Sequence, residues 1–259
     1  MHISLKAETL FHIGSWPVNN SLLAGVIGSL LIAVVFWLGA RALKRSPRSR
    51  LAQIVESLCE VIVDAIEAVT HDRAKALRFF PLLATLFIFI LINNWLGLLP
   101  GVGSITVQTE EGVVPLLRGA NADLNTTLAL AIISVVMTQV YAVRELGVIG
   151  HLSKYFSTNP VLSFVGLLEI VSEFSKMISF SFRLFGNIFA GEVLLIVISA
   201  LVPLVGPLPF FGLELFVGLI QALVFTMLSL VFLEIASSSH GGHKESGVES
   251  KLAARAVEV

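Results

Sequence analysis

Long uncharged stretches of apolar residues restrict this chain to one class of fold. The first of them, Ser21–Ala40, runs for twenty residues without a charged side chain. That length of helix is enough to cross about 30 Å of hydrocarbon. Of the 259 residues, 56% are hydrophobic and only 14% are charged, whereas roughly 25% are charged in a soluble domain. The chain is therefore predicted to be an integral membrane protein.

The same pattern recurs along the chain and predicts an all-α polytopic membrane protein with a single membrane domain over residues 1–259. Five helices are expected to cross the membrane, and the last two of them to form a long tilted hairpin. A sixth helix is amphipathic and is expected to lie along the membrane surface. Residues 1–20 are expected to be an exposed leader, and residues 238–259 a polar tail. The expected spans cover about residues 21–43, 79–98, 124–143, 161–201 and 210–237, and the surface helix about residues 51–72.

The distribution of Lys and Arg predicts how the chain is oriented. Residues 41–50 follow the first span and carry five basic side chains, so the positive-inside rule places this end in the cytoplasm. With five crossings, 13 of the 17 Lys and Arg residues fall on the cytoplasmic side and two, Lys6 and Arg118, fall outside. The N-terminus is therefore expected outside and the C-terminus inside. No aromatic residues interleave with the basic run, which disfavours a nucleic-acid patch.

The fourth expected span is longer than the membrane is thick. About forty residues of helix measure roughly 60 Å, twice the hydrocarbon thickness, so this helix must tilt, bend or lie across the membrane. Pro203, Gly206, Pro207 and Pro209 follow it and predict a turn before the last helix.

Arg183 lies within this long helix. A guanidinium near the middle of a bilayer is unfavourable by at least ~3 kcal/mol, so such residues usually face a partner or a water-filled path. A salt bridge to Glu169 or Glu173 is the structural alternative for Arg183. Lys176 could instead pair with Glu173 or extend to the membrane surface. Steps of three and four residues place Arg183 on one helical face with Glu169, Ser172, Lys176, Ser179 and Asn187.

Polar residues of the last two helices are expected to face one another if the helices fold back antiparallel around Pro203. Two carboxylates held together in a low dielectric cannot both ionise easily, so such a pair can accept and release a proton. Arg183 cannot lose its proton, so it would attract a carboxylate and repel a leaking cation. Two acid-lined vestibules separated by a fixed positive charge are therefore expected. The expected pairs are Arg183 with Gln221, Glu192 with Glu214 on the outer side, and Glu169 with Glu234 on the cytoplasmic side.

These residues include a specific motif. The segment Arg183-Leu-Phe-Gly-Asn187, followed by Ala190-Gly191-Glu192, strongly resembles subunit a of the F-type ATP synthase. The resemblance implies that the last two helices lie against a rotating ring of c subunits. The carboxylates of that ring would take protons from one half-channel and release them into the other. Further matching positions are Pro100, the Ala122–Asn125 segment, Glu169, Lys176 and Gln221.

The resemblance also implies roles for individual residues. Arg183 takes the position of the essential arginine, with Asn187 and Gln221 as its polar neighbours, and Glu192 and Glu214 line the outer half-channel. Many bacterial members carry a histidine at the position of Glu214, whereas this chain has an acid there. The proton pathway is predicted to comprise Glu192, Glu214, Asn187, Gln221, Glu169, Glu234, Lys176 and Glu173.

The implied partners are the c-subunit ring, the b subunits of the peripheral stalk, the remainder of the ATP synthase complex and the lipid bilayer. The expected location is the bacterial plasma (inner) membrane. No cofactor, metal or nucleic acid is expected, and ATP chemistry would occur on other subunits, so the chain is not expected to be an enzyme by itself. Two histidines, His240 and His243, are too few for a metal site.

Two other functions are compatible with a chain of several membrane helices. A self-contained ion-coupled secondary transporter would usually show inverted repeats and broken helices around a midplane site, and neither is found in the sequence. An inert membrane anchor predicts that Arg183→Ala is silent in proton-pumping assays.

Overall fold

The computed structural model describes residues 7–45, 50–99, 102, 105–109, 112–155, 160–203 and 205–237. Five helices of this part are long and apolar enough to cross a membrane, which confirms the expected all-α polytopic class. The expected tail at 238–259, with His240 and His243, lies outside the described residues. The helices are α1 Asn20–Arg45, α2 Arg50–Thr70, α3 Arg73–Gly97, α4 Leu124–Tyr155, α5 Pro160–Leu201 and α6 Pro207–Ser237.

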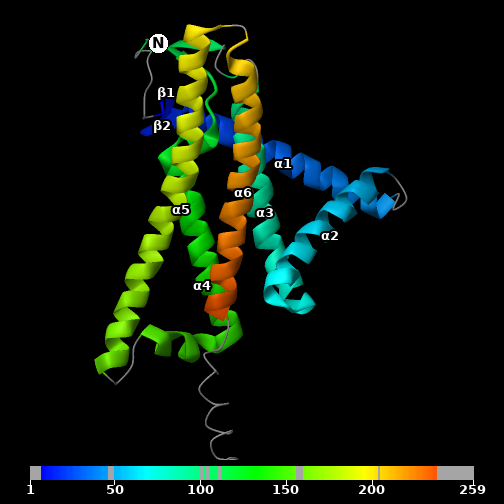
Figure 1. Ribbon diagram of the computed structural model, residues 1–259, viewed down its shortest axis with the longest axis vertical. Helices are drawn as coiled ribbons and strands as arrows, with labels where there is room; N and C mark the ends of the chain where they lie inside the picture. Colours follow the sequence, from blue (N-terminus) through cyan, green and yellow to red (C-terminus); the bar gives the residue numbers. More distant parts are fainter. Residues whose placement is uncertain are drawn as a thin grey trace, which may run out of the picture.

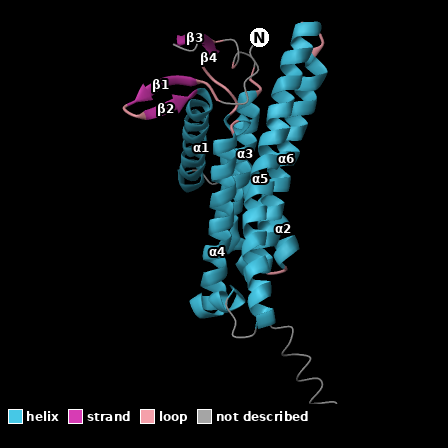
Figure 2. Ribbon diagram, turned by 90° about the vertical axis from the view of Figure 1, so that its left-hand side faces the viewer, coloured by secondary structure: helices cyan, strands magenta, loops and turns pink. Residues whose placement is uncertain are grey.

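Helices α5 and α6 form two antiparallel rods along the long axis of the molecule, with α3 and α4 packed beside them (Figure 1). Helices α1 and α2 diverge to one side of this bundle. The end that carries the strands and the turn between α5 and α6 is called the hairpin end. The opposite end, where α6 ends at Ser237 and α4 leads into α5, is called the tail end. Figure 2 shows the strands gathered at the hairpin end.

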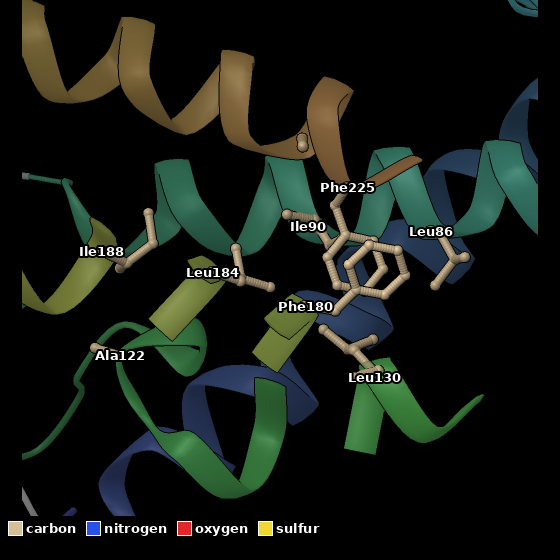
Figure 3. Packing of buried hydrophobic residues seen from close by; sticks show 10 residues of the cluster. Leu86, Ile90, Ala122, Leu130, Phe180, Leu184, Ile188 and Phe225 are labelled. Atoms are coloured by element: carbon tan, nitrogen blue, oxygen red, sulfur yellow. The ribbon is translucent and has the colours of Figure 1, made fainter. Parts of the chain in front are cut away.

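Side chains of α5 form the centre of the bundle core. Phe180, Leu184 and Ile188 recur at four-residue steps and are 3%, 0% and 9% exposed, so they form one buried face of the helix. Phe180 packs against Phe225 of α6 with ring centroids 4.8 Å apart. Figure 3 shows these side chains meeting Leu86 and Ile90 of α3 and Leu130 of α4. This buried face fixes the rotation of α5, and position 183, at its edge, stays exposed.

The turn between α5 and α6 depends on one glycine. A β-carbon on Gly206 would lie 2.6 Å from the carbonyl oxygen of Val202, so the chain can fold back this closely only where no side chain is present. Helix α6 begins at Pro207, three residues before the expected start of the last span. Proline is favoured in the first turn of a helix, where its missing N–H has no helical partner.

Helices α3 and α4 extend beyond their expected spans at the tail end. Helix α3 begins at Arg73, where the Asp72 carboxylate accepts hydrogen bonds from the N–H groups of Ala74 and Lys75. This cap adds turns that hold Lys75 near the core. Helix α4 continues past residue 143 to Tyr155, with a break at Gly147, whose φ of 74° is non-helical. The segment after the break runs across the tail end (Figure 1).

The hairpin end contains short strands that the sequence analysis did not predict. Strands β1 (Thr9–Ile13) and β2 (Trp16–Asn19) form an antiparallel pair within the expected leader, and β3 (Thr106–Thr109) and β4 (Gly112–Pro115) form another. A one-turn 3-10 helix, η1 (Ala120–Ala122), follows β4. Part of the segment between α3 and α4 therefore forms regular secondary structure.

Residues 118–123, which we call the cap segment, are held among the helices. Arg118 and Asp123 are each 7% exposed, and Asn121 is fully buried. The cap segment packs against α1, α3 and α5. It is thus part of the helical assembly and not a solvated loop.

Candidate functional site

Arg183 lies on an exposed face of α5. Its side chain makes one described hydrogen bond, from Nη2 to the hydroxyl of Ser179 at 3.4 Å. Among the described residues it forms no salt bridge. Its neighbours Ile178 and Phe182 are 56% and 57% exposed, so the surface around it is apolar. The alternative of a salt bridge from Arg183 to Glu169 or Glu173 is not found in this structure.

Asn187 lies one helical turn from Arg183 on α5, toward the hairpin end, and Gln221 of α6 lies beside it. The Asn187 side-chain amide donates a hydrogen bond to Oε1 of Gln221 at 2.8 Å. Gln221 is 4% exposed, and its Nε2 has no hydrogen-bond partner among the described residues. The sequence analysis paired Gln221 with Arg183, and the structure instead gives this contact to Asn187.

Glu214 occupies a buried position beside Gly191. Its side chain is 6% exposed, and Oε1 has no hydrogen-bond partner in the described part of the chain. A β-carbon built on Gly191 would overlap the Glu214 carboxyl. Glycine at this position therefore makes room for the acid between α5 and α6.

Glu192 follows Gly191 but has a different partner. Its two carboxylate oxygens each accept a hydrogen bond from Nε of Arg118 at 3.1 Å. The Arg118 guanidinium also lies 5.8 Å from the centre of the Phe189 ring. Glu192 and Glu214 thus occupy the same level of the hairpin, and the guanidinium hydrogen-bonds the carboxylate of Glu192.

Arg118 is the residue of this site that the sequence analysis missed. It was counted only as one of two basic residues on the outer side. The small number of basic residues on the outer side could have pointed to it. A single arginine on the acid-lined side of a membrane is expected to pair with one of the acids. Its position in the cap segment could not be derived from helical spacing.

A chain of asparagines continues from these acids into the bundle. The Asn94 amide donates to the carbonyl oxygen of Gly218 at 2.9 Å, and the Asn121 amide donates to Oδ1 of Asn94 at 2.7 Å. These bonds join α3, η1 and α6. In the described residues, Oδ1 of Asn93 and Oδ1 of Asn121 are buried without a hydrogen-bond partner. Buried polar atoms of this kind are sites that water commonly satisfies.

The predicted acids of the tail end are arranged differently. Glu234 of α6 forms an ion pair of 2.9 Å with Lys75 of α3, and Glu173 forms one of 2.6 Å with Lys176. Lys176 also lies 4.6 Å from the centre of the Phe232 ring. Glu169 is exposed. The expected facing pair of Glu169 and Glu234 is therefore not formed. Glu234 faces α3, whose early start at Arg73 brings Lys75 to it.

Comparisons with known proteins give a consistent family. Residues 22–234 match the family described as ATP synthase A chain. The chain is 31% identical to "ATP synthase subunit a" of Moorella thermoacetica over 92% of this chain and 98% of that protein. It is 34% identical to "ATP synthase subunit a 2" of a Bradyrhizobium species over 91% of this chain and 96% of that protein. Together with the five long apolar helices and the exposed arginine, these matches show that the chain is a multi-pass membrane protein that belongs to the ATP synthase A chain family.

Proposed function

We propose that this chain is the proton-translocating stator subunit of an F-type ATP synthase, in which Arg183 faces the carboxylates of a c-subunit ring. The observation that carries the proposal is the exposed guanidinium on an apolar membrane helix, which pairs with no acid among the described residues. A permanent cation in that position requires an anionic partner or a water-filled path. A carboxylate on a neighbouring membrane protein would supply that anionic partner.

The surface around Arg183 is suited to a partner made of membrane helices. Exposed apolar side chains of α5 and α6 flank the arginine along the two helices. Lys176, the only other basic residue of α5 and α6, is paired with Glu173. Such a surface allows the ring to slide past because the contacts are apolar and non-directional. The exposed apolar residues are Ile178, Phe182, Leu194, Phe216, Ile220, Leu223 and Val231.

Arg183 would act on a ring carboxylate by charge alone. At about 4 Å and an effective dielectric of about 20, the attraction between the two charges is about 4 kcal/mol. That attraction favours release of the proton from the carboxyl as it approaches. Because arginine stays protonated, it cannot relay the proton across the membrane. The ion must therefore leave through a path different from the one by which it entered.

The two paths are assigned to the two ends of the α5–α6 hairpin. The inlet half-channel lies at the hairpin end and contains Glu192, Glu214 and Gln221, near the buried polar atoms of the asparagine chain. The outlet lies at the tail end and contains Glu169, Glu173, Lys176 and Glu234. Proton flow between the two paths would require rotation of the ring and would thereby be coupled to ATP synthesis. That reaction takes place on other subunits, and this chain does not catalyse it.

The setting of the chain follows from its charges. Lys and Arg are concentrated toward the tail end, which we assign to the cytoplasm of a bacterial cell, with the N-terminus outside the plasma (inner) membrane. The assigned partners are the c ring, the b subunits of the peripheral stalk and the remaining subunits of the complex. Proton transport requires no metal or cofactor in this arrangement.

The test uses the whole complex reconstituted into vesicles, with ATP-driven proton pumping as the readout. Arg183→Gln is expected to abolish coupled pumping, and Arg183→Lys to reduce it severely because the charge remains but the planar donor set is lost. Lys44→Gln, which removes an exposed positive charge from α1, is the matched control and should pump normally. Normal pumping by Arg183→Gln would refute the proposal.

A further inference from the structure

We infer that Arg118 is a positioning residue of the inlet, where it holds the Glu192 carboxylate and sets the pH range over which the inlet carries protons. The inference rests on the proposed function, since it assigns a role to Arg118 within that inlet. It concerns a residue of the cap segment, outside the two helices that carry the other inlet residues.

The contact is close and largely hidden from solvent. The Arg118 side chain is 8% exposed and that of Glu192 is 31% exposed. Nε lies 3.1 Å from both carboxylate oxygens, and the Phe189 ring, one turn earlier on α5, lies beside the guanidinium. The arginine thus lies between an acid and an aromatic ring of the same helix.

The backbone on which Arg118 stands is fixed at three points. A β-carbon on Gly97 would lie 2.9 Å from Cα of Gly119, so the end of α3 packs directly on the residue after Arg118. Asn121 is fully buried and hydrogen-bonded to Asn94. Asp123 accepts a hydrogen bond of 2.8 Å from the hydroxyl of Ser21 on α1. The cap segment therefore presents Arg118 to Glu192 from a rigid support.

Among the described residues, three charged or titratable groups from the surrounding elements lie near Glu192. Arg118 of the cap segment attracts it, and Glu8, just before β1, repels it electrostatically. Glu214 of α6 lies against Gly191, the residue before Glu192. Only one of the three is a cation, and it cannot be deprotonated. Its removal would leave two acids near Glu192 and no counter-ion from the described residues, and a carboxylate in that situation retains its proton more readily.

Removal of the Arg118 charge is predicted to change the pH dependence of proton pumping, and not only the amount of assembled complex. With Arg118→Gln, the Glu192 carboxylate loses its counter-ion, so the pH dependence of proton pumping should move by about one pH unit toward alkaline pH. Arg118→Lys keeps the charge but replaces the Nε contact by a more flexible ammonium group, so its shift should be smaller. A purely structural arginine would alter the amount of assembled complex and leave the pH dependence in place.

The experiment measures ATP-driven pumping by the reconstituted complex across a pH series for the native chain, Arg118→Gln, Arg118→Lys, Glu192→Gln and the double variant Arg118→Gln/Glu192→Gln. The expected result is an alkaline shift in Arg118→Gln, a smaller one in Arg118→Lys, and no further shift when Arg118→Gln is added to Glu192→Gln. Lys44→Gln is the charge-matched control on α1. If Arg118→Gln does not assemble, the shift in Arg118→Lys decides the question.

An unchanged pH dependence in both Arg118 variants would overturn the inference, as would an equal shift in the presence and absence of the Glu192 carboxylate. Pumping by Arg183→Gln, measured alongside these variants, shows whether the role of Arg118 alone fails or the proposed function as well. Loss of pumping in Arg183→Gln with an unaltered pH dependence in Arg118→Gln rejects only the role of Arg118. Normal pumping in Arg183→Gln rejects the proposed function and, with it, the inlet.

Discussion

The two ends of the α5–α6 hairpin hold their acids in different ways. At the hairpin end, Glu214 is buried with a carboxyl oxygen that has no partner among the described residues, and Glu192 binds a permanently charged guanidinium. At the tail end, Glu234 and Glu173 each pair with a lysine, and the second carboxyl oxygen of Glu234 is buried without a partner among the described residues. One antiparallel helix pair thus presents two chemically different acid clusters. The difference lies in the groups around the acids: lysines at the tail end, and burial together with an arginine from outside the two helices at the hairpin end.

The largest effect is expected from filling the space beside Glu214. In Gly191→Ala, the new methyl group would overlap the Glu214 carboxyl and displace it, because interior space of this kind does not accept an added atom without strain. Stability of the assembled chain should fall by about 1–3 kcal/mol, and proton pumping should fall to a small fraction of the native rate. Thermal denaturation of the complex and vesicle pumping measure the two quantities.

Gly25→Ala is the matched control for this substitution. It lies within α1, and a β-carbon there would meet Ala120 at an ordinary contact distance of 3.5 Å. It should therefore be tolerated. Equal pumping by Gly191→Ala and Gly25→Ala would mean that the Glu214 carboxyl does not need its buried position.

An intermediate effect is expected at the tail end from breaking the ion pair between α3 and α6. Lys75 and Glu234 are 25% and 22% exposed, so Lys75→Gln should cost about 1 kcal/mol of stability, near the upper value for exposed pairs. Thermal denaturation of the complex should show this loss, and exchange of the two charges in Lys75→Glu/Glu234→Lys should restore it. A shifted pH dependence of pumping in Lys75→Gln would show that this pair also takes part in proton exchange and would remove the contrast between the two ends.

The smallest effect is expected at Glu169. Because its side chain is exposed, water in an open vestibule can carry protons in its place, and Glu169→Gln should lower pumping by no more than about twofold. Glu192→Gln at the hairpin end should lower it far more, and Glu56→Gln, exposed on α2, should have no effect. Pumping rates of the three variants in the same vesicles provide the measurement. A stronger loss in Glu169→Gln than in Glu192→Gln would reverse the assignment of the more confined path.

Features that depend on local periodicity could be predicted from the sequence. Three- and four-residue spacing along α5 places Arg183 and Asn187 on one shared face, and both are exposed in the structure. The length of α5 and the turn after it followed from composition and from prolines. These properties arise within a single helix, so they require no knowledge of its neighbours.

Contacts between elements could not be predicted in the same way. Gln221 bonds Asn187 and not Arg183, because the register of the hairpin depends on the packing of the turn at Gly206. Glu234 meets Lys75 because α3 begins earlier than its apolar stretch. Arg118 reaches Glu192 only because the cap segment is buried among α1, α3 and α5. Each of these depends on how separate elements pack, and spacing along one helix carries no such information.

The packing behind Arg183 has a mechanical consequence. Leu184, the next residue, is fully buried, and Phe180 lies one turn away against Phe225. In the proposed motor, each passing carboxylate would pull sideways on the middle of a 42-residue rod, where a slender beam bends most easily. Because the rod is braced from behind at that level by close-packed side chains of three other helices, it should resist bending, and most of the force would turn the ring.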